Sequence, residues 1–218
     1  NPGADQGVQH DAPLAPEECI VPGRDSVRGA PPRFVALDRD GTVIVERFRH
    51  LAELDEVELI PGAVEGLKEM HELGLGLVLI TNQSAVGRGI LDQARLESIH
   101  CHLRALLARE GIPLAGIYVC PHVPYDGCLC RKPMPGLLKQ AAQQLGTSPA
   151  SSFVIGDKAS DVQCGQKVGA ITILVRTGYG AQVAKEGTAK PDYTVDSLLE
   201  AAKVIQRIVC ESQEDEEH

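Results

Sequence analysis

The stretch Phe34-Val-Ala-Leu-Asp38-Arg-Asp40-Gly41-Thr42 decides the fold class of this 218-residue chain. Its four apolar residues, typical of a buried strand, run directly into two carboxylates spaced two residues apart. Gly41 then permits an abrupt turn, because glycine has no Cβ. In a parallel sheet, the carboxyl ends of the strands form the edge at which ligands bind. The stretch therefore predicts a buried strand that delivers Asp38 and Asp40 to a functional edge.

Strand-like and helix-like segments alternate after this stretch. The pattern predicts an α/β fold, a Rossmann-like parallel sheet with helices on both faces. The expected strands are 34–37, 77–80, 117–119, 153–155, 171–175 and 193–195, and the expected helices are 63–73, 91–110, 136–145, 160–168 and 197 to about 209. A single long helix is expected after Thr81, and only about 20 residues separate Thr42 from the first helix. We therefore expect no large cap domain.

Composition predicts one domain and excludes several kinds of partner. Residues 1–32 hold six of the 14 prolines and form an expected disordered lead-in, 33–210 form the domain, and 211–218 form an acidic tail. The formal net charge of −9 and the 3% aromatic content disfavour a nucleic-acid partner. No apolar run reaches membrane-spanning length, so no membrane partner is expected. We expect a monomer.

Polar residues also follow two other expected strands. Thr81-Asn82-Gln83-Ser84 follows one of them, and Asp157-Lys158 follows another. Asp38, Asp40, Thr81 and Asp157 should gather at one edge, with Lys132 reaching in from a loop. Such carboxylates bind Mg²⁺, and the metal and the lysine can neutralise a phosphoryl group. One carboxylate could then attack phosphorus while the other protonates the leaving oxygen.

Two other interpretations of these residues remain open. Any one of them alone could be a helix cap or a turn residue, and Asp161 could equally be a first-turn acid of a helix. A phospho-accepting, receiver-like signalling domain also uses Asp, Thr, Lys and Mg²⁺. Asp40 argues against that class, because a second acid/base group would promote the hydrolysis that a signal must avoid.

The segment Cys120-Pro-His122-Val-Pro-Tyr-Asp-Gly-Cys128-Leu-Cys130 predicts a metal loop over residues 120–130. Three thiols and one imidazole are the ligands of a closed, structural Zn²⁺ site. The alternatives are buried cysteines beside a surface histidine, or a zinc-dependent nucleic-acid module, which the acidic composition disfavours. The odd total of seven cysteines predicts a reducing compartment, the cytoplasm. His100 and His102 fall in an expected helix and receive no role.

The four polar segments, taken together and in order, resemble the motifs of the haloacid dehalogenase-like phosphatases. The matching segments are Asp38-Arg-Asp40-Gly-Thr42, Thr81, Lys132, and Gly156-Asp157-Lys158 with Asp161. The resemblance implies that Asp38 is the nucleophile and Asp40 the general acid/base, and that Thr81 and Lys132 hold the transferring phosphoryl group. It also implies Mg²⁺ bound by Asp38, the backbone carbonyl of Asp40 and Asp157.

The zinc loop directly before Arg131-Lys132-Pro133 narrows the resemblance to the histidinol-phosphate and heptose-bisphosphate phosphatase branch. The segment 81–89 favours the heptose-bisphosphate side, which implies a small phosphorylated sugar substrate and removal of the 7-phosphate of D-glycero-D-manno-heptose 1,7-bisphosphate. The substrate contacts that the resemblance implies are Glu46, Arg47, Phe48, Arg49, Asn82, Gln83, Ser84, Arg131 and Lys158.

Two departures from the heptose-bisphosphate pattern keep other substrates open. Only five residues separate His122 from Cys128, a spacing equally familiar in the histidinol-phosphate enzymes. Residues 46–49 read Glu-Arg-Phe-Arg, where the heptose family commonly has a Gly-Tyr pair. Histidinol phosphate or another small phosphomonoester therefore remains an alternative substrate.

Overall fold

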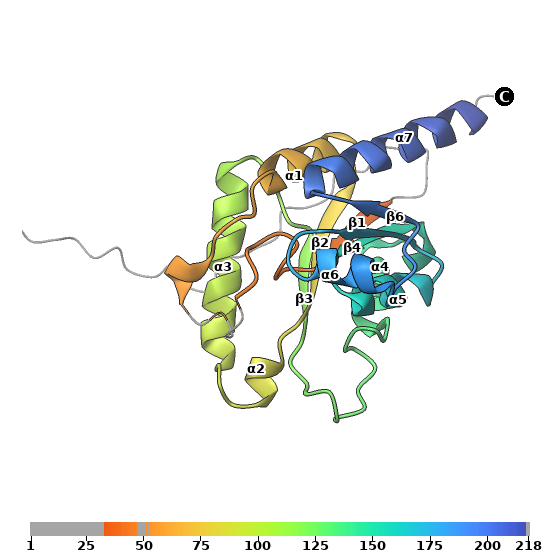
Figure 1. The fold of residues 1–218 in the computed structure, drawn as a ribbon. Helices are drawn as coiled ribbons and strands as arrows, with labels where there is room; N and C mark the ends of the chain where they lie inside the picture. The colour runs from red at the N-terminus through yellow and green to blue at the C-terminus, as the bar shows by residue number, and fades with distance from the viewer. Residues whose placement is uncertain (1–32, 48–50, 52, 217–218) are drawn as a thin grey trace, which may run out of the picture.

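A computed structural model describes residues 33–47, 51 and 53–216 of the chain (Figure 1). The expected lead-in 1–32 lies outside the described residues, as do Phe48 and Arg49. Six strands form one sheet with the order β3-β2-β1-β4-β5-β6, and every neighbouring pair is parallel. The strands are β1 (Phe34–Leu37), β2 (Gly76–Asn82), β3 (Gly116–Cys120), β4 (Ser152–Gly156), β5 (Ile171–Val175) and β6 (Tyr193–Val195).

Helices cover both faces of the sheet, which confirms the predicted fold class (Figure 1). Because strand side chains alternate, Val35 and Leu37 of β1 face one hydrophobic cluster, while Phe34 and Ala36 face the other. The first cluster includes residues of α1 (Ala63–Glu72), α3 (Gln93–Arg109) and α7 (Leu198–Glu216). The second includes residues of α4 (Gly136–Leu145) and α5 (Ala159–Gln166).

The centre of the sheet brings three polar strand ends together. β1 pairs with β2 through Phe34 and Gly76 and with β4 through Phe34 and Ser152, so the three strands run in register. The backbone N–H of Asp38 donates to the carbonyl of Ile155 at 2.9 Å, which extends the pairing by one residue. The residues that follow β1, β2 and β4 therefore meet at one edge, as the strand pattern predicts.

Two connections differ from the expected helices. The segment after Thr81 is not one long helix, because α2 (Ser84–Gly87) ends at a glycine-containing turn before α3 begins. Asp92 caps α3, since its side chain accepts a hydrogen bond from the Arg95 N–H. A further helix, α6 (Gly180–Glu186), follows β5 and was not predicted, because it is short and has only one buried residue, Gly180.

Other connections are short. Between β1 and α1 the described residues form turns, isolated β-bridges that join Ile44 to Asp40 and to Leu59, and the 3₁₀ helix η2 (Leu54–Glu56). A second 3₁₀ helix, η3 (Pro149–Ser151), precedes β4. The chain segments that are described include no inserted cap domain, as expected.

The last helix runs farther than its expected end at about residue 209. α7 continues to Glu216, because the glutamates and glutamine after Val209 favour a helix and no proline or glycine stops it. Both terminal nitrogens of Arg33 lie within 3.3 and 3.4 Å of the Ser212 hydroxyl, so the helix end is tied to the start of β1. Among the described helices, none has the length and apolar character needed to cross a membrane.

Candidate active site

Lys132 lies at the centre of the polar edge, buried between two carboxylates. Its Nζ is 2.7 Å from Oδ1 of Asp38 and 2.7 Å from Oδ1 of Asp161. It also donates to the Ile80 carbonyl at the end of β2, at 2.7 Å. The side chain is 2% exposed, so these three oxygen atoms replace the water that an ammonium group would otherwise keep. The lysine thus joins the ends of β1, β2 and α5.

The charges at this edge favour the ionised forms of Asp38 and Lys132. Burial alone would raise the pKa of Asp38, but the ammonium groups of Lys132 and Lys158 outweigh burial and lower it. Burial likewise would lower the pKa of Lys132, but Asp161 and Asp38 raise it. Asp38 is therefore a carboxylate and Lys132 a cation at neutral pH, which is the pairing that a nucleophile and a phosphoryl-binding group require.

Asp157 lies in a slot formed by two glycines. A Cβ built on Gly41, which has φ of +84°, or on Gly178 would lie 2.2 Å from Oδ2 of Asp157. That oxygen accepts a hydrogen bond from the Tyr179 N–H at 2.8 Å. Burial and repulsion from Asp38 raise the pKa of Asp157 to about 7. The carboxylate is therefore poised for a cation that would hold it ionised.

The geometry around Lys158 fits a magnesium site. Its ammonium lies 3.7 Å from Oδ2 of Asp38, 3.6 Å from Oδ1 of Asp157 and 3.4 Å from the carbonyl oxygen of Asp40. These are the three groups that the resemblance assigns to Mg²⁺, and all three face one point of positive charge. Oδ1 of Asp157 is buried and accepts no hydrogen bond from the described residues. An all-oxygen set of this kind suits a hard divalent cation.

The Asp40 carboxylate accepts hydrogen bonds from two side chains, Arg39 and Gln83. Arg39 donates to both of its carboxylate oxygens, at 3.1 and 3.0 Å, and Gln83 donates to Oδ2 at 2.8 Å. The amide nitrogen of Gln83 also contacts Oγ1 of Thr81 at 2.9 Å. The ends of β1 and β2 are thus linked through side chains, and the carboxylate of Asp40 has a fixed orientation.

The four predicted zinc ligands come together in one cluster. The sulfurs of Cys120, Cys128 and Cys130 lie 3.3 to 3.6 Å apart, and Nδ1 of His122 lies 3.6 and 3.2 Å from two of them. Ligands bound tetrahedrally to zinc at about 2.3 Å would be separated by about 3.8 Å, so the cluster needs only a slight expansion. Burial raises the pKa of the Cys120 thiol to about 12, so a metal would have to displace its proton.

Comparison with known proteins points to one family. A family model described as HAD-hydrolase-like matches residues 129–201. The D-glycero-beta-D-manno-heptose-1,7-bisphosphate 7-phosphatase of Yersinia pestis is 39% identical over 181 residues, which cover 79% of this chain and 94% of that protein. The enzyme of the same name from Escherichia coli K12 is 34% identical, with 79% and 93% covered.

A solved structure agrees with these sequence matches. The D,D-heptose 1,7-bisphosphate phosphatase from B. bronchiseptica, complexed with magnesium and phosphate, is 32% identical. It superposes with a TM-score of 0.75 over 81% of this chain and 98% of that one. The chain belongs to the haloacid dehalogenase-like phosphatases, in the heptose-bisphosphate phosphatase branch. It is a phosphoric monoester hydrolase.

Within this haloacid dehalogenase-like phosphatase, several residues expected to contact substrate make contacts to the protein. The Asn82 side-chain amide donates to the Lys132 carbonyl at 3.1 Å and accepts from the Lys132 backbone N–H at 3.0 Å. Gln83 is buried against Asp40 and Thr81. Ser84 begins α2 and is half-buried. Asn82 and Gln83 thus support the groups that the family places at the reacting phosphate.

Of the other expected substrate contacts, Glu46 reaches the site, whereas Arg131 and Arg47 contact other protein groups. Arg131 donates from Nη1 to the carbonyl of His122 at 3.2 Å, which ties it to the thiol cluster. Glu46 accepts from Lys158 at 2.8 Å and therefore reaches the site. Arg47 instead pairs with Glu58 at 2.9 Å. Phe48 and Arg49 lie outside the described residues.

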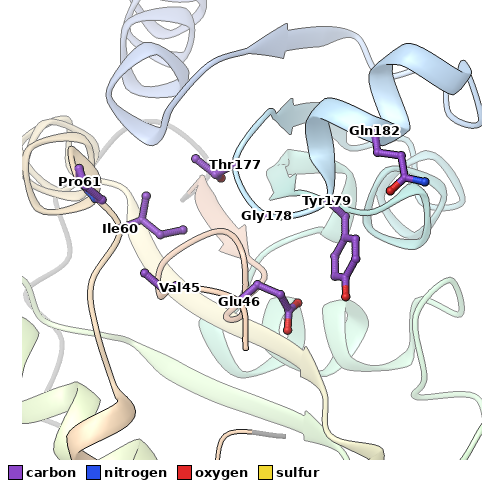
Figure 2. A pocket seen from close by; sticks show the side chains of 8 residues that line it. All are labelled: Val45, Glu46, Ile60, Pro61, Thr177, Gly178, Tyr179 and Gln182. Atoms are coloured by element: carbon purple, nitrogen blue, oxygen red, sulfur yellow. The ribbon is translucent and has the colours of Figure 1, made fainter. Parts of the chain in front are cut away.

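The lining of a cavity of about 480 Å³ includes Glu46, the carboxylate that pairs with Lys158 (Figure 2). Val45, Ile60 and Pro61 give it an apolar wall, while Glu46, Tyr179 and Gln182 bring polar atoms to it. The ammonium of Lys158 lies 5.2 Å from the centre of the Tyr179 ring, so the same lysine contacts the cavity lining and the oxygens of Asp38 and Asp157. Of the lining residues that the structure describes, none is a cation.

Two buried side chains next to this phosphatase site, Arg39 and His100, have no role predicted from the sequence. Arg39 lies between the two carboxylates of the first motif in sequence, and its buried side chain contacts Asp40. His100 was predicted only as part of an amphipathic helix, and it lies 3.0 Å from Nη1 of Arg39. A charged residue between two functional carboxylates was the available signal for Arg39. The position of His100 depends on how α3 packs, which its sequence pattern does not specify.

Proposed function

We propose that the chain is a Mg²⁺-dependent phosphatase that removes the 7-phosphate of D-glycero-D-manno-heptose 1,7-bisphosphate through an aspartyl-phosphate intermediate. The observation that carries the chemistry is the buried contact between Lys132 and Asp38, with Asp157 and the Asp40 carbonyl facing the same space. The substrate rests on the names of relatives that share 34 to 39% identity over most of their length. Residues 33–210 are proposed as the single catalytic domain.

The residues have distinct roles in this proposal. Lys132 holds the Asp38 carboxylate in place through Oδ1, and a carboxylate oxygen of Asp38 attacks phosphorus in line with the leaving oxygen. The bond between phosphorus and the leaving oxygen breaks, and that oxygen takes a proton from the Asp40 carboxyl. Asp40 then removes a proton from water, which attacks the phosphorus. The bond to Asp38 breaks, and inorganic phosphate leaves. Thr81 and Lys132 bind the transferring phosphoryl oxygens.

Two metals complete the proposal. Asp38, Asp157 and the carbonyl of Asp40 would hold Mg²⁺, which supplies charge neutralisation to the phosphoryl group when bound. The three thiols and His122 would hold one structural Zn²⁺, because all four ligands come from the chain and no position is left open. A reducing compartment such as the cytoplasm suits these thiols.

The cavity supports a placement for the substrate. The sugar can use the wall of Val45 and Ile60 and the polar atoms of Tyr179 and Gln182. The second phosphate would meet the Glu46 carboxylate there and no cation of the described lining, so it belongs on the other side of the site. Arg131, beside Lys132, supplies a guanidinium suited to that phosphate.

The test is a comparison of kcat/KM for three substrates with Mg²⁺ present. The two anomers of the heptose 1,7-bisphosphate and histidinol phosphate are assayed in parallel, before and after chelation. The heptose bisphosphate is expected to be the best substrate, with release of the 7-phosphate and loss of activity on chelation. A higher kcat/KM for histidinol phosphate would contradict the substrate, and turnover in chelator would contradict the metal.

A further inference from the structure

A buried series of polar groups leads from α3 to Asp40, and no step of the proposed mechanism uses its first two members. His100 of α3 contacts Arg39, and Arg39 contacts Asp40. The Arg39 side chain is only 1% exposed and His100 is 6% exposed. A buried guanidinium is costly unless it is fully paired, so its placement needs a reason.

The contact between Arg39 and Asp40 restricts rotation of the Asp40 carboxylate. Nε and Nη2 of Arg39 reach Oδ2 and Oδ1 of Asp40, at 3.1 and 3.0 Å, as a two-pronged pair. The planar guanidinium fork fixes both the distance and the plane of the carboxylate. Gln83 adds a third bond from the side of β2, at 2.8 Å. Asp40 itself remains 17% exposed, so the gripped carboxylate still faces the open site.

The contact between Arg39 and His100 fixes the guanidinium in turn. A guanidinium can only donate, so Nε2 of His100 is the acceptor across the 3.0 Å contact and carries no proton. Burial, with the charges of Arg39 and Arg104, lowers the pKa of His100 to about 3, which keeps the ring neutral. A carboxylate at the position of His100 would form a second ion pair with Arg39 and weaken its pairing with Asp40. A neutral acceptor orients the guanidinium, and Asp40 stays the charged partner of Arg39.

We propose that Arg39 and His100 are positioning residues that hold Asp40 in the orientation needed to protonate the leaving oxygen. The inference rests on the acid/base role of Asp40 in the proposed function. Neither residue touches substrate, and both act through the Asp40 carboxylate. Replacing Arg39 or His100 should therefore lower kcat/KM most for substrates whose leaving oxygen needs a proton.

Leaving groups of different basicity test this consequence. A sugar alkoxide needs the proton, whereas p-nitrophenolate leaves readily without it. We compare kcat/KM, which reports the steps through departure of the leaving group, for the heptose bisphosphate and p-nitrophenyl phosphate. The variants are Arg39→Met, which keeps an unbranched stem without the guanidinium, His100→Leu, which removes the acceptor, and His100→Gln, which restores a neutral acceptor. Thermal unfolding of each variant checks the fold.

The expected result is an asymmetric loss. Arg39→Met and His100→Leu should lower kcat/KM on the sugar phosphate on the order of 10- to 100-fold, because small misplacements of a catalytic group have effects of that size. They should lower it less than about threefold on p-nitrophenyl phosphate, and His100→Gln should recover most of the sugar-phosphate activity. Equal losses on both substrates in folded protein, or no loss on either, would overturn the inference.

Asp40→Asn separates this inference from the proposed function. If Asp40→Asn shows the same asymmetry and the Arg39 and His100 variants do not, the positioning role is wrong and the general acid stands. If Asp40→Asn shows no asymmetry, the acid role of Asp40 is wrong, and the inference falls with it. If Arg39→Met fails to fold, the comparison of His100→Leu with His100→Gln tests the inference alone, because these two side chains differ chiefly in the hydrogen-bond acceptor.

Discussion

The Nζ of Lys132 and the Oδ1 of Asp38 lie 2.7 Å apart, although their residue numbers differ by 94. Both side chains are almost completely buried. The contact gives the expected nucleophile a permanent positive neighbour, and it places that neighbour where a phosphoryl oxygen would also arrive. Charge development in the transition state can therefore be balanced without reorganising the site.

Asp38→Asn should abolish turnover and leave the fold intact. An amide is not a nucleophile in this reaction, while its shape and one acceptor oxygen remain for Lys132. Steady-state assays on the heptose bisphosphate and thermal unfolding are measured on the same preparation. Measurable turnover by well-folded Asp38→Asn would eliminate the aspartyl-phosphate mechanism.

Lys132→Met should lower kcat/KM by roughly 10²- to 10³-fold, the usual effect of losing one strong electrostatic contact. Without the ammonium, burial dominates and the pKa of Asp38 rises, because Lys132 is a main reason that it is low. The acid limb of the pH profile of kcat/KM should therefore move to higher pH. The matched control is Lys68→Met, which removes an exposed lysine paired with Glu110. An unmoved acid limb in Lys132→Met would contradict the pairing.

One equivalent of zinc should copurify with the chain, separate from the Mg²⁺ needed for activity. Elemental analysis of protein prepared without chelator measures it. Cys128→Ser should release the metal and lower activity indirectly, because Arg131 bonds the His122 carbonyl within the same loop. Cys210→Ser changes an exposed thiol outside the cluster and should retain the zinc. Active, folded wild-type protein with far less than one equivalent would refute the site.

Arg131→Ala should lower kcat/KM on the heptose bisphosphate by about one to two powers of ten. A charge-assisted hydrogen bond in a partly buried site contributes about 1.5–3 kcal/mol. A sugar monophosphate has no second phosphate to bind, so its kcat/KM should fall much less. If Arg131 only supports the thiol cluster, Arg131→Ala should lower kcat/KM equally on both substrates and should also lower thermal stability. That outcome would leave the second phosphate without its proposed partner.

Acid should weaken the fold through His100. Its folded-state pKa of about 3 lies below the ordinary 6.5, so between these values the unfolded chain binds a proton that the folded chain does not. The free energy of unfolding therefore falls as pH decreases below about 6.5. The stability difference between wild type and His100→Gln should shrink by about 2 kcal/mol between about pH 7.5 and pH 5. Urea unfolding at both pH values measures it, and a constant difference would show that His100 is not responsible.

Much of this architecture could be predicted because it depends on local pattern. The central strands are short apolar runs, and the polar residues at the carboxyl ends of β1, β2 and β4 meet because parallel strands share an edge. The contact between Arg39 and His100 could not be predicted, since it depends on how a helix 61 residues away packs on the sheet. The Asn82 contact with the Lys132 backbone also joins residues far apart in the chain, at a separation of 50. Such pairs follow from tertiary packing, which a single sequence does not display.

The slot around Asp157 has a consequence for mutational tolerance. Glycine is the smallest residue, so every amino-acid replacement at Gly41 or Gly178 adds at least a Cβ, and each would fall 2.2 Å from the Asp157 carboxylate. No neighbouring side chain can be shortened to make room, because the obstructing atom belongs to the Asp157 carboxylate itself, the group proposed to hold Mg²⁺. In a library of random variants, these two positions should be as intolerant as the carboxylates, although neither glycine has a side chain to contribute to the chemistry.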